Sequence, residues 1–145
     1  MRLSKKERAI EQIEYEMTTF IRMATYVDQT AKKVGIFERA TYLLLRELDK
    51  LGSARLKTLA DVLKLDISTV SRQAASLESK GLIERLADPS DGRATLFHLT
   101  ATGKEKLAMD KKIRLSRYNQ WLEEWTEEEC EIFKNLLNRL NNSFI

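Results

Sequence analysis

Cysteine, histidine and proline are almost missing from this sequence, and glycine is scarce. Its 145 residues include one cysteine, one histidine, one proline and five glycines. A single cysteine excludes an internal disulfide framework and any zinc site built from several cysteines. A single histidine, His98, removes most metal-ligand sets and histidine-based catalytic pairs. With so few residues that interrupt helices, we expect long helices and no collagen-like or low-complexity segment.

Long apolar runs are missing as well. A membrane-spanning helix needs about 18 or more consecutive apolar residues, and no stretch of the chain approaches that length. The polar N-terminus also lacks the apolar stretch of a signal peptide. Because 43% of the residues are hydrophobic, the chain can bury a real core. We therefore expect one cytoplasmic, mostly helical domain with an added dimerisation element, no membrane contact, and no cofactor or metal ion.

Charges of the two signs are nearly balanced, with 25 lysines and arginines against 22 acidic residues. The basic and acidic counts are 10 and 8 in residues 1–52, 7 and 6 in residues 53–103, and 8 and 8 in residues 104–145. A basic stretch at 104–117 precedes an acidic one at 123–131, and we interpret both as solvated helix surface. Net charge is therefore weak evidence for nucleic-acid binding.

The first 34 residues carry the pattern of a long packing helix. Ser4 and Glu7 have the spacing of a capping box. Apolar residues then recur at alternating steps of three and four from Ile10 to Val34, and Gly35 breaks the pattern. A repeat of 3.5 residues is typical of a helix that packs along another long helix. Because about 30 helical residues span about 45 Å, we expect a second copy of the chain to cover the overhang.

The rest of the chain predicts a fold that is mainly α with a small β-hairpin. The expected elements are a central helix from Phe37 to Leu51 ended by Gly52, two short helices at 56–63 and from Ile67 to a stop at Lys80-Gly81, strands at 82–86 and 95–99 around a turn at 88–92, a helix to about Trp125, and a final helix from Thr126. Thr100 or Thr102 can cap the first long helix after the hairpin, and Thr102 with Glu105 has the spacing of a second capping box. Thr126 with Glu129 has the spacing of a capping box.

The second of the two short helices has an unusual polar side. Its apolar side is expected to face inward and consists of Ile67, Val70, Ala74 and Leu77. The other side then shows short hydroxyls, one arginine and one glutamine: Ser68, Thr69, Ser71, Arg72, Gln73 and Ser76. In the DNA major groove, arginine pairs with guanine, glutamine with adenine, and hydroxyls with bases or phosphates. A plain amphipathic surface helix is the alternative, but it would more often carry glutamate and lysine.

The turn of the hairpin carries Arg93 beside Asp91. In a plain surface turn, these two side chains would pair with each other for little energy. Behind a helix-turn-helix, Arg93 is expected to enter the DNA minor groove, where narrow A·T tracts concentrate negative potential, while Asp91 holds the guanidinium in position. Arg55, Lys57 and Lys64 are expected to contact the DNA backbone.

Five short motifs lie along the chain in a characteristic order. They are Leu59-Ala60, Thr69-Val70-Ser71-Arg72, Leu77-Glu78-Ser79-Lys80-Gly81-Leu82-Ile83, Asp91-Gly92-Arg93 and Leu99-Thr100-Ala101-Thr102-Gly103. Together with the length and the element order, they resemble the MarR family of bacterial transcription regulators over nearly the whole chain. The resemblance implies a winged helix-turn-helix inserted between N- and C-terminal dimerisation helices. The dimerisation helices would be 1–34 and 104–145, the central helix 35–52, and the DNA-binding region 53–103.

The resemblance also implies partners. It implies a homodimer on a pseudo-palindromic operator of double-stranded DNA, most often a repressor that a small aromatic or anionic effector releases. On the matching positions, the second short helix would face the major groove and Arg93 the minor groove. The candidates for lining an effector pocket are Arg22, Tyr26, Tyr118 and Trp121, although aromatic residues on long helices equally fit a core or an interface.

The single cysteine is not expected to act as a redox sensor. Cys130 lies in the first turn of the last expected helix, where the helix dipole favours a thiolate. The surrounding glutamates, Glu127, Glu128, Glu129 and Glu131, disfavour a second negative charge. His98, on a strand beside Phe97, is expected to be structural.

Catalysis is not expected, because one histidine and one cysteine far apart offer no nucleophile–base pair and the chain has no glycine-rich phosphate loop. Two alternatives to a sequence-specific regulator stay open at this point: a winged-helix adaptor for protein interaction, and a non-specific DNA-binding protein. An adaptor should expose apolar residues on the second short helix, where this chain has hydroxyls, arginine and glutamine. A salt titration separates them, because DNA binding weakens steeply as salt rises.

Overall fold

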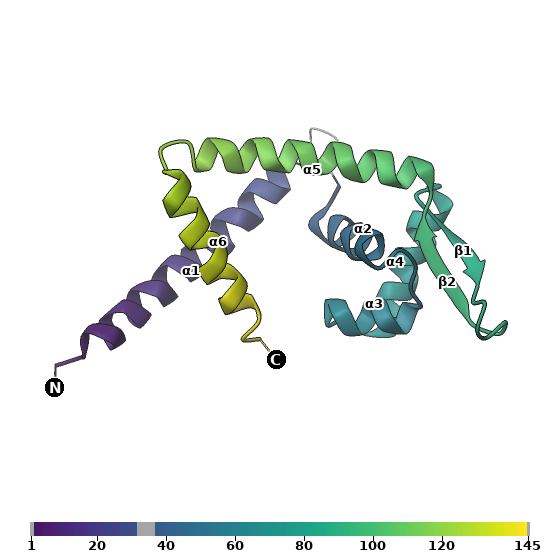
Figure 1. The fold of residues 1–145 in the computed structure, drawn as a ribbon, viewed down its shortest axis with the longest axis horizontal. Coiled ribbons are helices and arrows are strands. Elements are labelled where there is room, and N and C mark those ends of the chain that lie inside the picture. Colours follow the sequence, from purple (N-terminus) through teal and green to yellow (C-terminus); the bar gives the residue numbers. More distant parts are fainter. Residues whose placement is uncertain (1, 32–36, 145) are drawn as a thin grey trace. The chain divides into compact units, whose positions relative to one another are not determined.

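Residues 2–31 and 37–144 are described in a computed structural model, and they form helices with one two-stranded hairpin (Figure 1). The elements are α1 (Lys5–Ala31), α2 (Arg39–Leu51), α3 (Leu56–Leu63), α4 (Ile67–Ser79), β1 (Ile83–Ala87), β2 (Thr95–Leu99), α5 (Ala101–Trp121) and α6 (Glu127–Asn141). This order confirms the predicted one. Val34 and Gly35, where the first helix is expected to end, lie outside the described residues. Contacts divide the chain into two compact units, residues 1–107 and residues 108–145.

The core of the first unit is built around α2, as its apolar pattern predicts. Leu44, Leu45 and Leu48 have no exposed surface, and they share one buried cluster with residues of α3, α4 and the hairpin, among them Leu59 and Val70. Burying a leucine side chain contributes about 1.5–3 kcal/mol relative to leaving it exposed. The inner faces of α3 and α4 are therefore fixed against α2, which determines their outer faces as well.

The hairpin is antiparallel and extends from the cluster of α2, α3 and α4 with its loop at the far end (Figure 1). Its register pairs Ile83 with Leu99 and Arg85 with Phe97, so that the buried side chains of both strands meet the core. Ala54, just before α3, forms a single antiparallel bridge to β2: its N–H donates to the Phe97 carbonyl at 3.0 Å, and its carbonyl accepts from the Phe97 N–H at 2.8 Å. The hairpin is thus attached to the segment that leads into α3.

The start of α5 lies against the hairpin. Thr100, and not Thr102, caps the helix: its Oγ1 accepts from the Gly103 N–H at 3.0 Å and donates to the Gly81 carbonyl at 2.6 Å. A Cβ placed on Gly103 would lie 2.0 Å from the Leu82 carbonyl oxygen. Only glycine fits there without movement of the backbone, and this close packing explains the glycine at the end of the Leu99–Gly103 motif.

Three expectations about elements need correction. Ile67 is 53% exposed rather than inward-facing, because it is the first residue of α4 and lies at the edge of the core beyond the buried Val70. The first strand begins at Ile83, one residue later than expected. The helix expected to reach about Trp125 ends at Trp121, because the extended backbone of Thr126, which caps α6, requires the chain to leave the helix first.

Large apolar side chains remain exposed on helices of both units. On α1 they include Ile10, Ile13 and Phe20. All residues of α6 are described and none of its side chains is buried, although Leu136 lies on its apolar face. The predicted capping boxes at Ser4–Glu7 and Thr126–Glu129 are confirmed by reciprocal hydrogen bonds. None of the described helices is long and apolar enough to cross a lipid bilayer.

Candidate nucleic-acid interface

The N-terminus of α4 is fixed by Asp66. Its carboxylate accepts a hydrogen bond from the Ser68 hydroxyl at 2.6 Å and from the Thr69 N–H at 2.7 Å. These bonds favour the ionised carboxylate, the bond from Ser68 first, and lower the pKa of Asp66 to about 2. Asp66 is therefore a charged N-cap at neutral pH, and it orients the first turn of the helix.

One face of α4 gathers the short polar side chains that the sequence predicts for DNA. Ser68, Ser71, Arg72 and Ser76 are exposed and Thr69 is half-buried, whereas Val70, Ala74 and Leu77 are buried on the other side. Arg72 makes a long 3.4 Å contact with the Thr69 hydroxyl of its own helix, and its charge also acts on the Asp66 N-cap. Its guanidinium is therefore available to an acceptor outside the protein.

Gln73 lies at the edge of this face rather than in its middle. It is half-buried, and within the described part of the chain its buried Oε1 has no hydrogen-bond partner. It lines a cavity of about 460 Å³ together with residues of α1 and α2, including Asp28 and Arg39. A second cavity of about 450 Å³, between α2 and α4, is lined by Gln73, Arg72 and Ser76.

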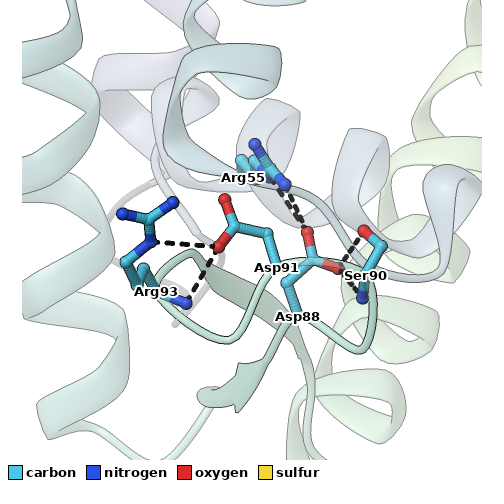
Figure 2. A network of polar contacts seen from close by, with 5 residues as sticks. All are labelled: Arg55, Asp88, Ser90, Asp91 and Arg93. Carbon is cyan, nitrogen blue, oxygen red and sulfur yellow. Dashed lines mark hydrogen bonds and ion pairs between the residues drawn. The ribbon is translucent and has the colours of Figure 1, made fainter.

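The loop of the hairpin is held by an ion pair that the sequence does not predict. Figure 2 shows Arg55 pointing at Asp88, with Arg55 Nη2 2.5 Å and Nε 3.1 Å from Asp88 Oδ2. Asp88 Oδ1 accepts from the Ser90 N–H at 2.9 Å and from the Ser90 hydroxyl at 2.8 Å. The bond from Arg55, followed by those from Ser90, lowers the pKa of Asp88 to about 2, and Asp88 raises the pKa of Arg55.

Asp91 and Arg93 lie side by side at the tip of the same loop (Figure 2). Asp91 Oδ1 accepts from the Arg93 N–H at 3.1 Å and lies 3.7 Å from the Arg93 Nε. The Arg93 side chain is 96% exposed. The predicted pairing with Asp91 is thus present, and the pairing leaves the guanidinium in solvent.

Arg85 is a further residue that sequence reasoning missed. Its Nε lies 2.9 Å from Glu78 Oε2, so that β1 is joined to the last turns of α4. The guanidinium also stacks over the Phe97 ring at 5.1 Å from the centroid. A helix residue and a strand residue seven positions apart follow neither periodicity, so no spacing rule could have found this pair.

The other predicted DNA-backbone residues lie on α3 and its end. Lys57 is exposed in the first turn of α3, and Lys64 is exposed at its C-cap, where it has the left-handed conformation with φ of 57°. Arg55 precedes α3 and is occupied by Asp88, as described above. Lys57 and Lys64 therefore lie at opposite ends of α3.

The candidates for an effector pocket lie in both units. Arg22 and Tyr26 are exposed on α1, and they are not among the described residues that line the 460 Å³ cavity of the first unit. In the second unit, Tyr118 and Trp121 make an edge-to-face ring contact with centroids 5.0 Å apart.

Cys130 is half-buried near the start of α6.

Comparison with known proteins decides the family. The sequence profile of the MarR family matches residues 37–95, from the start of the α2 region to the first residue of β2. Over 141 residues, the chain is 55% identical to a protein of Bacillus subtilis (strain 168) named as an uncharacterized HTH-type transcriptional regulator, YxaD. That alignment covers 97% of this chain and 99% of YxaD. The chain belongs to the MarR family.

Solved structures of MarR proteins share this fold. A MarR family protein from Bacillus stearothermophilus superposes with a TM-score of 0.82 at 18% identity, covering 97% of this chain and 98% of that one. A cysteine-to-serine mutant of Escherichia coli MarR, solved in complex with operator DNA, gives a TM-score of 0.64 at 22% identity, covering 86% and 95%. The predicted winged helix-turn-helix, mainly α with a small hairpin, is confirmed.

Proposed function

We propose that this MarR-family protein binds a pseudo-palindromic operator of double-stranded DNA as a homodimer and represses transcription until a small aromatic or anionic effector releases it. The observation that carries the proposal is the exposed polar face of α4, together with an exposed Arg93 in the hairpin loop. That face presents Ser68, Ser71 and Arg72, and no acidic residue lies between Ile67 and Leu77. Arginine and short hydroxyls at a surface with room for close approach suit base edges and phosphates.

Two reading elements would act together on DNA. Ser68, Thr69, Ser71 and Arg72 enter the major groove, with Gln73 and Ser76 at the edge of the contact. Arg93 enters the adjacent minor groove, where a narrow A·T tract favours a guanidinium. Lys57 and Lys64 neutralise backbone phosphates. So few phosphate contacts are compatible with the net charge of residues 53–103, which is close to zero. The structure of an Escherichia coli MarR mutant with operator DNA supports this mode of binding by analogy of fold.

The exposed apolar helices support the homodimer. Ile13 and Phe20 on α1 and Leu136 on α6 are each more than half exposed. Contiguous apolar surface on a protein that is otherwise well packed marks an interaction site. A winged helix-turn-helix in a symmetric dimer reads two half-sites about one helical turn, or about 34 Å, apart, and this doubles the contacts that specify sequence.

The cavity of the first unit supports an effector. Its volume of about 460 Å³ falls within the range of about 300–1,000 Å³ that is usual for small-molecule sites. Apolar side chains, including Leu43 and Leu63, line it together with Arg39 and Gln73, whose Oε1 has no hydrogen-bond partner among the described residues. An aromatic ring suits the apolar part, and the anionic group of an effector would compete with Asp28, which lies 2.7 Å from Arg39 Nε, for the guanidinium.

The test is binding selection on random duplex DNA at about 150 mM salt, an ionic strength at which weak non-specific binding is suppressed. We expect an inverted repeat with half-sites about one helical turn apart. Binding that appears only at low salt and without sequence preference would support a non-specific DNA-binding protein. Affinity for a protein partner that barely responds to salt, with no DNA binding, would support an adaptor.

A further inference from the structure

We propose that Asp88 is a positioning residue for DNA recognition: its carboxylate holds the hairpin loop to the start of α3 through Arg55, and thereby presents Arg93 to the minor groove. This inference rests on the proposed function, since it assigns Arg93 to DNA. It gives Arg55 a different role from the phosphate contact expected from the sequence.

The two oxygens of the Asp88 carboxylate have separate partners. Oδ2 accepts both bonds from Arg55, and Oδ1 accepts both bonds from Ser90. Asp88 is 8% exposed, so little water competes for these bonds. A hydrogen bond between charged groups is stronger than one between neutral groups. The carboxylate therefore joins the body of the protein on one side to the loop on the other.

The hairpin is attached to the same short segment at two places. The backbone of Ala54 pairs with the middle of β2 at Phe97. The next side chain, Arg55, reaches Asp88 at the beginning of the loop. The first attachment fixes the middle of β2, and the second restrains the loop at the far end of the hairpin. Without the second, the loop could swing about the Ala54–Phe97 bridge.

Hydrogen bonds inside the loop carry the restraint from Asp88 to Arg93. The Asp88 N–H donates to the Ala94 carbonyl at 3.1 Å, and the Ala94 N–H donates to the Asp91 carbonyl at 2.9 Å. The Asp91 N–H donates to the Asp88 carbonyl at 3.3 Å, and the Asp91 side chain accepts from the Arg93 N–H. Arg93 is therefore fixed at its backbone while its side chain stays in solvent.

The sign of a charge change separates this role from simple electrostatics. DNA is negatively charged, so removing a carboxylate close to it should strengthen binding if only net charge matters. If Asp88 positions the loop, removing its charge weakens binding, because the fraction of protein with a binding-competent wing falls and the apparent Kd rises in proportion. The two accounts predict opposite signs for one substitution.

Asp88→Asn is the decisive variant. An asparagine has one acceptor oxygen, so its amide group must face either the Arg55 guanidinium or the Ser90 N–H, donor against donor. On the duplex recovered by selection, we expect Asp88→Asn to bind about tenfold more weakly. The matched control is Asp61→Asn, on the exposed surface of α3. It removes the same charge and should bind as tightly as the wild type, or more tightly.

Two double variants complete the design. Arg55→Gln with Asp88→Asn restores the net charge, so a charge effect predicts wild-type affinity, whereas the positioning role predicts affinity as weak as that of Asp88→Asn alone. Arg93→Ala should reduce DNA affinity much less in the Asp88→Asn protein than in the wild type, because a misplaced Arg93 contributes less to binding.

Amide hydrogen exchange of the free protein supplies a readout that needs no DNA. We expect exchange at Ser90 and Ala94 to accelerate about tenfold in Asp88→Asn, since a loop that opens more often exchanges faster. Unchanged protection of those amides, or wild-type affinity of Asp88→Asn, overturns the positioning role. If the wild type selects no site, the proposed function fails instead, and the exchange rates still decide whether Asp88 holds the loop. Thermal unfolding identifies any variant that has simply lost its fold.

Discussion

The region that we propose reads DNA and the terminal helices of this MarR-family protein differ in how much of their apolar surface is buried. Between α2 and β2, Leu59, Val70 and Phe97 are at most 2% exposed. On α1 and α6, Ile13 and Leu136 are each 54% exposed. A single chain therefore completes the core behind the proposed reading surface, while α1 and α6 keep large apolar side chains exposed. This contrast agrees with a monomeric reading unit inside a dimeric protein.

The ion pairs show a similar contrast. Two ion pairs of the first unit join separate elements: Arg55 reaches Asp88 in the hairpin loop, and Glu78 on α4 reaches Arg85 on β1. On α6, Lys134 pairs with Glu131 only three residues away. An exposed pair such as Lys134–Glu131 contributes little to stability, whereas the pairs between elements also fix how those elements are placed.

The largest effect is expected where α5 meets the hairpin. Gly103→Ala places a Cβ against the Leu82 carbonyl, and the backbone must move to accept it. We expect a loss of about 3 kcal/mol in the free energy of unfolding, at the upper end for overpacking. Urea denaturation followed by circular dichroism measures it. Gly92→Ala, which meets nothing within 4 Å, is the matched control and should change stability by less than about 0.5 kcal/mol. Equal losses for the two variants would contradict the packing account.

The next largest effect is expected on the exposed apolar face of α6. Leu136→Glu places a charge on the apolar face of α6 and should leave the fold of the single chain intact, since that side chain is already 54% exposed. We expect the mass in solution to fall from two chains to one, because an unpaired charge in an interface costs several kcal/mol. Light scattering measures it. Asn135→Glu, exposed on the same helix, should remain dimeric. A dimer that survives Leu136→Glu would remove α6 from the interface.

A smaller effect tests the reading surface. Arg72→Ala should reduce discrimination at one base pair of each half-site by about 2 kcal/mol, because a bidentate contact to one base edge is lost. Affinities for the selected operator and its single-base variants measure this. Arg46→Ala removes an equal charge from α2 and should weaken all sites alike, if at all. A uniform loss for Arg72→Ala would mean that Arg72 contacts phosphate rather than a base.

The smallest effect concerns acid stability. The pKa values of Asp66 and Asp88 are lowered to about 2 in the folded protein, whereas an aspartate in an unfolded chain has a pKa of about 3.9. Each carboxylate therefore contributes stability that is fully present above about pH 4 and is lost as the pH falls toward 2. Asp66→Asn and Asp88→Asn should flatten the fall in stability between pH 4 and 2. Acid unfolding curves that superimpose on the wild type would contradict these shifts.

Local patterns in the sequence predict most of the fold. The order of elements, the capping boxes and the hairpin strands follow from periodicity, cap residues and turn residues, all of which act within a few positions of the chain. The errors concern the ends of helices. Ile67 is exposed because the apolar side of α4 extends beyond the core, and α5 ends at Trp121 because Thr126 needs an extended backbone. Local periodicity contains no information about where a core stops.

The candidate site was less predictable because it depends on contacts between distant residues. The exposed face of α4 follows from its apolar stripe, and the Asp91–Arg93 pair lies within one turn. Arg55 and Asp88, by contrast, are 33 residues apart, and Arg55 looks like any other basic residue near a DNA-binding helix. No spacing rule indicates such a pair. For the same reason, the half-buried position of Gln73 became visible only with α2 in place.

The most direct measurement is the mass of the complex formed on the selected operator and on an isolated half-site. With native mass spectrometry, the account predicts two chains on the full inverted repeat, and a half-site that binds far more weakly than the whole. For Leu136→Glu, we expect the affinity for the full repeat to fall to the affinity for the half-site. One chain bound to the half-site as tightly as two on the full repeat would contradict the claim that two single-chain reading units act together on DNA.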